Sequence, residues 1–193
     1  MEPGQKVFIQ AGAGGVGSIA IQLAKNLGAY VTTTASAKNE QRVRELGADQ
    51  VIDYHTTQFE DVLSDYDIVF DTLGGNQLDK SFKILKPGGR IVSVSGLPNA
   101  KFGRERKLGW LKTWLFGLAT LKLSRLERKY HVSYHFLFMQ PSGKELEQLT
   151  KLIEQEKLIP IIDRIFSLPD AQAALEYSET GHAHGKIIIK VDE

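Results

Sequence analysis

The sequence predicts an α/β protein built on a doubly wound, parallel sheet of six strands. Over the first 140 residues, short strand-like runs alternate with helical patterns, and these runs are apolar throughout rather than at every second position. Such strands are typical of a parallel sheet that helices cover on both faces. Because crossovers between parallel strands are nearly always right-handed, the doubly wound open sheet is the simplest topology.

Each strand is predicted from a short apolar or β-branched run, and each helix from apolar residues at helical spacing. The expected strands are 7–10, 30–34, 51–52, 68–70, 90–95 and 132–139. The expected helices are 16–27, 38–46, 57–64 and 77–85, with Gly28 and Gly47 closing the first two. The turn at 86–89 (Lys-Pro-Gly-Gly) is expected to end the fourth helix.

The pattern changes after residue 140. A helix (144–155), a strand-like run (158–166), a helix that begins at Pro169 (169–178) and a final strand (186–191) follow. We therefore divide the chain into a sheet domain, residues 1–140, and a C-terminal α+β appendage, residues 141–193.

Composition excludes several classes of protein. The chain has 193 residues, of which 42% are hydrophobic and 24% charged, so it can bury a core and is not disordered. A net charge of +1 argues against a protein that binds polyanions through bulk charge, and we expect no nucleic-acid partner. The absence of cysteine excludes disulfides, thiolate nucleophiles and cysteine-ligated zinc. Without a secretory signal or a transmembrane run, we expect a cytoplasmic protein with no membrane partner.

Residues 101–130 are strongly basic, with nine Lys or Arg against two Glu, a net charge of +7. Leu108, Leu111, Leu115 and Leu118 recur at spacings of three and four, which predicts an amphipathic helix with a basic face. Such a helix can lie on a membrane surface or bind nucleic acid. We favour a helix that packs on the core with a solvated rim, because this is the more common arrangement.

A glycine-rich loop lies between the first predicted strand and the first predicted helix. Gly12, Gly14 and Gly17 form a G-x-G-x-x-G pattern at the position where a dinucleotide fingerprint occurs. The first glycine permits a tight turn, the second lets the backbone approach a pyrophosphate, and the third lets helix and strand pack closely. The free N–H groups of the helix that starts near Gly15 and Val16 would face the phosphates. The alternative is a glycine-rich turn with no ligand.

The end of the second strand indicates which dinucleotide binds. An NAD site uses a carboxylate about 20 residues after the loop to hold the ribose 2′-hydroxyl, yet no Asp or Glu occurs between Gly17 and Asn39. Ser36 and Lys38 offer a hydroxyl and a positive charge to a 2′-phosphate instead, which favours NADPH. Lys38 could equally be an exposed residue in the first turn of a helix. The missing acid also argues against a methyltransferase.

Several motifs together resemble the medium-chain dehydrogenase/reductase superfamily, which is alcohol dehydrogenase-like, and within it the NADPH-dependent quinone oxidoreductases without zinc. They cover nearly the whole chain in the expected order. The motifs are Ala-Gly-Gly-Val-Gly (13–17), Ala-Ile-Gln-Leu-Ala-Lys (20–25), Glu-Leu-Gly-Ala-Asp (45–49), Val-Ile-Asp-Tyr (51–54), Phe-Asp-Thr-Leu-Gly-Gly (70–75), Leu-Lys-Pro-Gly-Gly-Arg (85–90) and Gly-Lys-Ile-Ile-Ile-Lys-Val (185–191).

The resemblance implies an NADPH-dependent enzyme that transfers hydride to a quinone or an activated alkene or carbonyl, and it implies where the cofactor binds. Tyr54, with the polar residues after the second strand, would contact the adenosine 2′-phosphate. The residues beside the cofactor would be Thr72, Leu73 and Gly74, and those near the nicotinamide Val94, Ser95 and Gly96. The family's phosphate-binding lysine usually falls where Asn39 stands, one position after Lys38.

Members of this superfamily begin with a separate catalytic domain, which the present sequence lacks. We therefore expect a cofactor domain without its N-terminal GroES-like domain. The appendage would normally pack on that domain, so its strands would lack their usual partners. The substrate is expected to be a small, apolar molecule.

Other chemical constellations are weak. No Tyr-x-x-x-Lys pair exists, which excludes the short-chain dehydrogenase mechanism. His131 with His135, or His182 with His184, could hold a metal, but neither pair has cysteine or helical support, and we expect no metal. Asp71 is expected to accept backbone hydrogen bonds rather than act as a base. No catalytic acid or base is assigned, because the cofactor carries the hydride chemistry.

Two alternatives to a reductase remain: a regulatory module that binds NADPH without turnover, and a peripheral membrane or interaction protein that uses the basic helix. We also predict a homodimer through residues 132–139. In this superfamily the last strand commonly pairs with its symmetry mate. The segment has no Pro, Gly, Lys or Glu to guard its edge. The alternative is a monomer whose appendage covers that edge.

Overall fold

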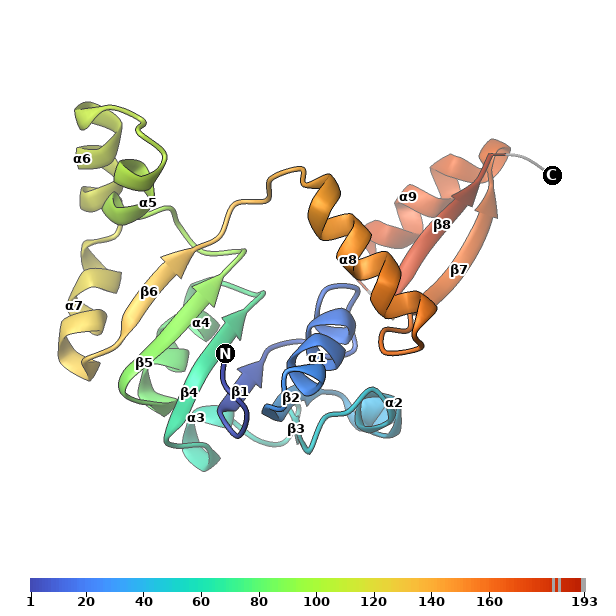
Figure 1. Ribbon diagram of the computed structural model, residues 1–193, viewed down its shortest axis with the longest axis horizontal. Coiled ribbons are helices and arrows are strands. Elements are labelled where there is room, and N and C mark those ends of the chain that lie inside the picture. Colours follow the sequence, from blue (N-terminus) through green and yellow to red (C-terminus); the bar gives the residue numbers. More distant parts are fainter. Residues whose placement is uncertain (182, 184, 192–193) are drawn as a thin grey trace.

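Six parallel strands form the main sheet in the order β3-β2-β1-β4-β5-β6 (Figure 1). The computed structural model describes residues 1–181, 183 and 185–191. The strands are β1 (Lys6–Ile9), β2 (Tyr30–Ala35), β3 (Gln50–Asp53), β4 (Tyr66–Asp71), β5 (Leu85–Ser93) and β6 (Ser133–Phe136). Every neighbouring pair is parallel, which confirms the predicted fold class. The chain order reverses between β1 and β4, and at such a reversal a crevice opens at the carboxyl ends of the strands.

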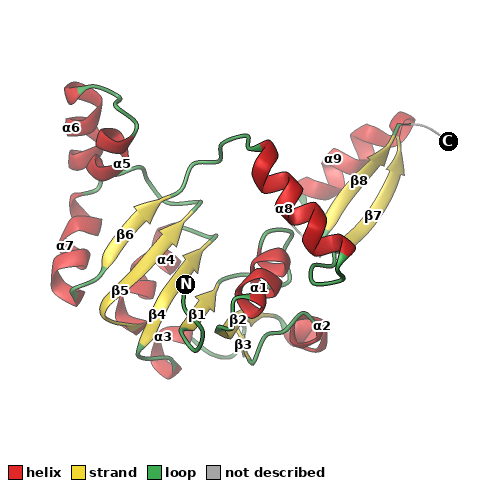
Figure 2. Ribbon diagram, in the orientation of Figure 1, coloured by secondary structure: helices red, strands yellow, loops and turns green. Residues whose placement is uncertain are grey.

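Helices lie on both sides of this sheet (Figure 2). One buried cluster joins the sheet to α1 (Gly17–Asn26) and α2 (Glu40–Glu45). A second joins it to α3 (Phe59–Val62), α4 (Gly75–Ser81) and α7 (Leu121–Tyr130). Successive residues of β1 divide between them, because neighbouring side chains of a strand point to opposite faces: Phe8 belongs to the second cluster, and Val7 and Ile9 to the first.

The turn predicted at 86–89 is instead part of β5. Helix α4 ends at Ser81 and a 3₁₀ turn (Phe82–Ile84) follows, so the helix ends before the Pro-Gly-Gly sequence. The pairing of β4 with β5 shifts register between Tyr66 and Ile68, and this irregularity accommodates residues 86–89. The second predicted helix also begins as a 3₁₀ turn (Ala37–Asn39) before α2.

The basic stretch forms three helices rather than one: α5 (Ala100–Glu105), α6 (Trp110–Ala119) and α7. Gly109, at φ +86°, separates α5 from α6 in a backbone conformation that favours glycine. Helix α7 buries Leu123 in the core, but α6 buries none of its residues. The expectation that the leucines at 108, 111, 115 and 118 pack on the core is therefore wrong.

The C-terminal segment contains α8 (Gly143–Glu154), β7 (Ile162–Ser167), a 3₁₀ turn (Leu168–Asp170), α9 (Ala171–Glu179) and β8 (Lys186–Lys190). Strands β7 and β8 pair with each other in parallel, and the other edge of each is unpaired within the described residues. The segment before β7 is bound to α1: Gln22 Nε2 donates to Ile159 O (3.0 Å), and Ile159 N donates to Gln22 Oε1 (2.7 Å). Among the described residues, no helix is both long enough and apolar enough to cross a membrane.

Candidate functional site

The glycine loop after β1 is fixed by the neighbouring strand β2. Ala11 N donates to Thr34 Oγ1 (2.9 Å), and Gly12 N donates to Thr34 O (2.9 Å). A Cβ at Gly12 would collide with the side chain of Thr33, and one at Gly17 would collide with Ala11 O. These two glycines therefore allow the loop, the strand and the helix to pack closely.

Gly14 and Gly15 lie in more open positions. A Cβ at Gly14 would have one close neighbour among the described atoms, Ala11 O at 3.3 Å. Helix α1 follows directly, with no side-chain cap at Val16 and no acidic residue in its first turn. The first N–H groups of a helix have no intrahelical partner and carry partial positive charge, so this end of α1 suits an anion.

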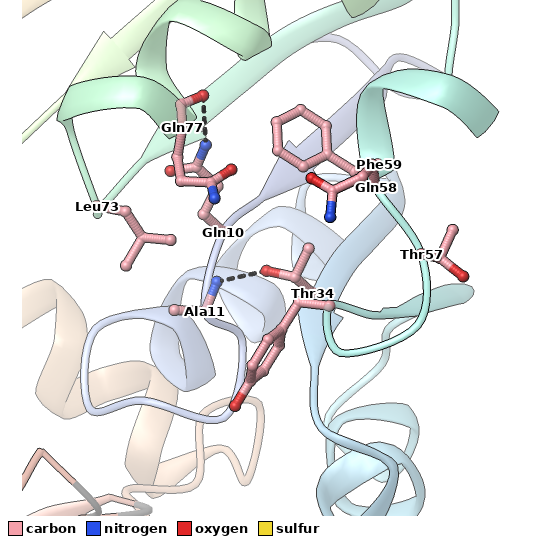
Figure 3. Close-up of a pocket in the computed structure, with 9 residues that line it drawn as sticks. Gln10, Ala11, Thr34, Thr57, Gln58, Phe59, Leu73 and Gln77 are labelled. Carbon is pink, nitrogen blue, oxygen red and sulfur yellow. Dashed lines mark hydrogen bonds between the residues drawn. The ribbon is translucent and has the colours of Figure 1, made fainter.

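A pocket of about 320 Å³ opens beside this loop (Figure 3). Its lining comes from the residues that directly follow β1, from the end of β2 and from the segments that follow β3 and β4, so it lies at the point where the strand order reverses. This is where open α/β sheets bind their ligands. The lining residues are Gln10, Ala11, Thr34, Tyr54, Thr57, Gln58, Phe59, Leu73 and Gln77.

Gln10 gives this pocket a buried acceptor. Its Nε2 donates to Ser81 Oγ (2.9 Å) and to Gln77 O (3.4 Å), which fixes the orientation of the amide. Its Oε1 is buried and has no hydrogen-bond partner among the described residues. Since buried polar atoms are rarely left unpaired, a bound group or a water that donates a hydrogen bond fits this position.

Asp71, at the end of β4, organises two more loops at the same edge of the sheet. Its Oδ1 accepts hydrogen bonds from Gly74 N (2.9 Å) and Leu73 N (3.3 Å), and its Oδ2 accepts one from Ser93 Oγ. Ser93 Oγ in turn accepts from Gly96 N (2.8 Å). The prediction of a structural carboxylate at Asp71 is confirmed.

Further hydrogen bonds join the loops after β1, β4 and β5. Thr72 Oγ1 donates to Gln10 O (3.1 Å), and Ser95 Oγ donates to Thr72 O (2.8 Å). Gly74, at φ +69°, lies so close to Ser95 O that a Cβ would reach within 2.6 Å of it. The three loops therefore form one hydrogen-bonded surface at the carboxyl edge of the sheet.

Tyr134 of β6 packs against the loop that follows β5. It is fully buried, and its Oη donates to Leu97 O (2.9 Å). Burial raises the pKa of Tyr134 to about 12; hydrogen bonds with Ser93 and Leu97 lower it in part, and the charge of Asp71 adds to the increase. A Cβ at Gly96 would collide with this hydroxyl, so Gly96 and Tyr134 form one packed unit.

Two of the predicted cofactor residues line the pocket, and the others lie outside it. Tyr54 and Leu73 line the pocket and are half exposed. Ser36 is buried and Lys38 exposed, just after β2, and neither lines the pocket. The predicted nicotinamide residues Val94, Ser95 and Gly96 follow β5 and also lie outside it.

Sequence analysis did not identify two residues that lie near this region, Lys186 and Asp53. The Nζ of Lys186, from β8, would lie 3.6 Å from a Cβ built on Gly15, so the C-terminal strand places a cation beside the glycine loop. Asp53 pairs with Ala35 in the sheet, so a carboxylate ends the strand next to β2. Its Oδ1 accepts from His55 N (3.0 Å). Only tertiary structure brings Lys186 and Gly15 together, so no local motif could reveal it.

The histidines do not form a metal site in the described part of the chain. His131 caps the end of α7, whereas His135 lies in β6 with its Nδ1 3.1 Å from Lys101 Nζ. Burial lowers the pKa of His135, and the charge of Lys101 lowers it further. His182 and His184 lie outside the described residues. Among the described residues, no three His, Asp or Glu side chains gather to hold a metal.

Comparison with known proteins gives consistent matches. A family model described as zinc-binding dehydrogenase matches residues 46–189. A mitochondrial NAD(P)H oxidoreductase of Danio rerio is 33% identical over 98% of this chain and 50% of its own length. A chloroplastic NADPH-dependent alkenal/one oxidoreductase of Arabidopsis thaliana is 32% identical over 96% of this chain and 40% of its own length.

A solved structure agrees with these matches. The quinone oxidoreductase from Coxiella burnetii is 36% identical and superimposes with a TM-score of 0.81, over 99% of this chain and 54% of its own. The chain thus spans about half the length of the proteins it matches.

Proposed function

Because the chain belongs to the zinc-binding dehydrogenase family, we propose that it is the NADPH-binding part of an oxidoreductase that delivers hydride to a quinone, an activated alkene or a carbonyl. The names of its relatives support a nicotinamide-dependent oxidoreductase. The family is named for zinc, but no group of three candidate ligands occurs among the described residues, so we assign the metal no role in this part of the enzyme.

The packing of the glycine loop is the observation that carries the proposal. Two of its glycines lie too close to their neighbours for a side chain, and a third has more room on the side where a ligand would approach. Gly12 and Gly17 have no room for a side chain, whereas a Cβ at Gly14, beside the uncapped start of α1, would have one close neighbour, Ala11 O at 3.3 Å. A phosphate at this position would receive backbone hydrogen bonds and the favourable end of the helix dipole. Lys186 would add a positive charge beside Gly15.

The rest of the site fits the two ends of a dinucleotide. The pocket between Gln10, Thr34 and Tyr54 would hold the adenosine, with Gln10 Oε1 as a free acceptor. The linked loops that carry Thr72 and Ser95 would hold the other half of the molecule. When bound, the nicotinamide supplies the hydride. This chain's residues fix its position through the hydrogen bonds that Asp71 and Ser93 make to these loops.

NADPH is proposed over NADH because of the groups that follow β2. Ser36 offers a hydroxyl and Lys38 an exposed ammonium group, and β2 itself ends without a carboxylate. Asp53, on the neighbouring strand, is the acid that could favour NADH instead. The preference therefore depends on whether Lys38 or Asp53 faces the ribose.

Thermal unfolding with each cofactor tests this proposal. At a hundredfold excess over Kd, binding raises the free energy of unfolding by about 2.7 kcal/mol. We expect a larger shift with NADPH than with NADH at equal concentration. Lys38→Glu should reverse that order. Lys186→Gln should weaken the binding of both cofactors about tenfold, equivalent to about 1.4 kcal/mol. Glu147→Gln, on the exposed face of α8, is the control.

The proposal is refuted if neither NADPH nor NADH shifts the unfolding temperature, and the preference is refuted if the shift with NADH is equal or larger. Turnover is tested separately with a panel of quinones, enones and aldehydes. Turnover of any of these substrates by this chain would favour the reductase over a regulatory nucleotide-binding module.

A further inference from the structure

Helix α6 carries an apolar face that no described part of the chain covers. It consists of Trp110, Leu111, Trp114, Leu115 and Leu118, which recur along one side of the helix. Trp110 is 81% exposed and Trp114 56%, and the three leucines are exposed to a similar extent as Trp114. We call these five residues the α6 apolar face. Clusters of large exposed apolar side chains mark sites of interaction.

The opposite side of α6 is firmly packed on α5, which holds this face outward. Gly103 lies so close to Thr113 that a Cβ would come within 2.8 Å of its Oγ1. The rings of Phe102 and Phe116 are 6.4 Å apart. Figure 1 shows the α5–α6 pair at one end of the molecule, beyond β6 and far from the C-terminal segment. The α6 apolar face is therefore a fixed feature of the fold.

Positive side chains border this face. Arg104 and Lys107 of the α5 end line a groove together with Trp110 and Trp114, and Lys112 projects from α6 itself. None of these three cations forms an ion pair within residues 1–181, 183 and 185–191. Residues 101–130 as a whole carry nine Lys or Arg against two Glu. The partner must therefore be apolar at its centre and negatively charged around it.

We propose that the α6 apolar face docks on an anionic lipid surface. Trp and Leu side chains would enter the headgroup region, while Arg104, Lys107 and Lys112 would contact the lipid phosphates and carboxylates. With ten residues, α6 can lie in such an interface but cannot span the bilayer. This inference departs from our sequence-based expectation of no membrane partner. That expectation assumed that the leucines pack on the core, and the structure leaves them exposed.

Charge and shape argue against two other partners for the α6 apolar face, a second copy of this chain and a nucleic acid. A second copy seated face to face on this surface would bring two clusters of unpaired cations together. A nucleic acid would match the charge, but it would leave the three leucines against a polar, hydrated strand. A lipid surface satisfies both the apolar centre and the positive rim.

Tryptophan fluorescence offers a direct readout, because the chain has only two tryptophans and both lie in the α6 apolar face. The full chain is mixed with vesicles of phosphatidylcholine alone, or with about 30% phosphatidylserine, and pelleted in parallel. We expect a blue shift of the emission and co-sedimentation with the anionic vesicles only. Salt of about 1 M, which reduces the Debye length to about 3 Å, should weaken both effects.

Two variants separate the apolar and the charge contributions. Leu111→Asp with Leu115→Asp should abolish the blue shift, and Arg104→Glu with Lys107→Glu should reduce vesicle binding more than about tenfold. Leu146→Asp, at a similarly exposed leucine on α8, is the matched control and should bind as the wild type does. Circular dichroism and the unfolding temperature confirm that each variant is folded.

The proposal fails if anionic vesicles cause no blue shift, if neutral vesicles bind equally well, or if the charge reversals have no effect. It also fails if the emission shifts with protein concentration alone and Leu111→Asp converts a dimer to a monomer, since the face would then join two copies. A blue shift with an oligonucleotide but not with vesicles would point to nucleic acid and overturn it as well.

Discussion

At the scale of single residues, the glycines of the first loop have different physical roles, although one motif contains them all. Gly12 and Gly17 are packed against Thr33 and Ala11, so a side chain at either would disrupt the fold itself. Gly14 has room on its open side, so a side chain there would obstruct only what approaches from outside. The motif predicts a different role for each glycine, and the packing shows which of them leave no room for a side chain.

We expect Gly14→Val to remain folded and to lose the thermal shift with NADPH, because its methyl groups would occupy the space of the pyrophosphate. Gly17→Val should instead lower the free energy of unfolding by at least about 2 kcal/mol, because its side chain meets backbone. Gly143→Val, at a glycine with no neighbour within 4 Å, is the control and should keep both properties. Differential scanning fluorimetry with and without cofactor measures all three. An undiminished shift in Gly14→Val would remove Gly14 from the proposed site.

Tyr134 gives a prediction for alkaline pH. Burial raises its pKa in the folded protein from 10.0 to about 12, so between these values the folded state holds a proton that the unfolded state releases. Stability from this group is therefore complete below pH 10 and decreases as the pH rises toward 12. Tyr134→Phe lacks this titration but loses the hydrogen bond to Leu97, at a cost of about 1 kcal/mol at neutral pH.

The wild type should consequently exceed Tyr134→Phe in stability at pH 8, and this difference should shrink or reverse near pH 11.5. Urea denaturation at the two pH values measures it. The pKa of Tyr66 is also raised, but this residue is present in both proteins and cancels in the comparison. A difference that stays constant with pH would contradict the shifted pKa of Tyr134.

At the scale of elements, the sequence predicts which strands and helices are present better than it predicts where each one begins and ends. All six strands of the main sheet were predicted from the sequence, because short uninterrupted apolar runs are typical of parallel strands that are buried on both faces. The start of β5 was missed, because Pro87 and Gly88 have the chemistry of a turn. In the structure the register shift beside them, and a hydrogen bond from Gly88 N to His131 O (2.7 Å), keep them in the sheet.

Helix α6 shows a second limit of sequence-based prediction. The spacing of its leucines correctly indicates an apolar face, but spacing does not reveal what covers that face. The breaks at Gly109 and Thr120 were also overlooked, so three helices were predicted as one. The candidate site shows the same contrast: the glycine motif is local, whereas Asp53 and Lys186 come near the site only through tertiary structure.

The end of α7 offers a test of helix termination. His131 closes this helix in the left-handed conformation, at φ +55°, which is strained for any residue with a Cβ. His131→Gly should raise the free energy of unfolding by about 0.5–1 kcal/mol, since glycine adopts this conformation freely but loses more entropy on folding. Ser124→Gly, inside the same helix, should lower it by a similar amount. Chemical denaturation of both variants checks the opposite signs, and a destabilised His131→Gly would show that its side chain matters more than its backbone.

At the scale of the whole molecule, the position of the C-terminal segment bears on two expectations about assembly, a homodimer and a monomer. A monomer required this segment to cover the edge of the main sheet. It is bound instead to α1, through Gln22 and Asn26, at the other side of the molecule from β6 (Figure 1). Strand β6 is the last in the sheet and pairs only with β5 within the described residues. Its outer edge is therefore free to pair with another strand.

We predict a homodimer in which β6 pairs with its twin across a two-fold axis. The paired segment is shorter than residues 132–139, because β6 ends at Phe136 and the next three residues are exposed. Phe136→Lys is a poor test, since Phe136 packs edge-on against Phe102, with ring centroids 5.2 Å apart, and its loss would disturb the fold. Phe138→Lys is better, because Phe138 is 61% exposed and, two residues beyond β6, would place a charge beside the end of the twin strand.

Light scattering at micromolar concentration should give about twice 21.5 kDa for the wild type and a mass near 21.5 kDa for Phe138→Lys. Leu175→Lys, at an equally exposed apolar position on α9, should remain dimeric, which shows that added charge alone does not dissociate the protein. A wild type that is already monomeric would end this proposal. A dimer that survives Phe138→Lys but dissociates with Leu175→Lys would move the interface from β6 to the C-terminal segment, where β7 and β8 each have one edge unpaired among the described residues.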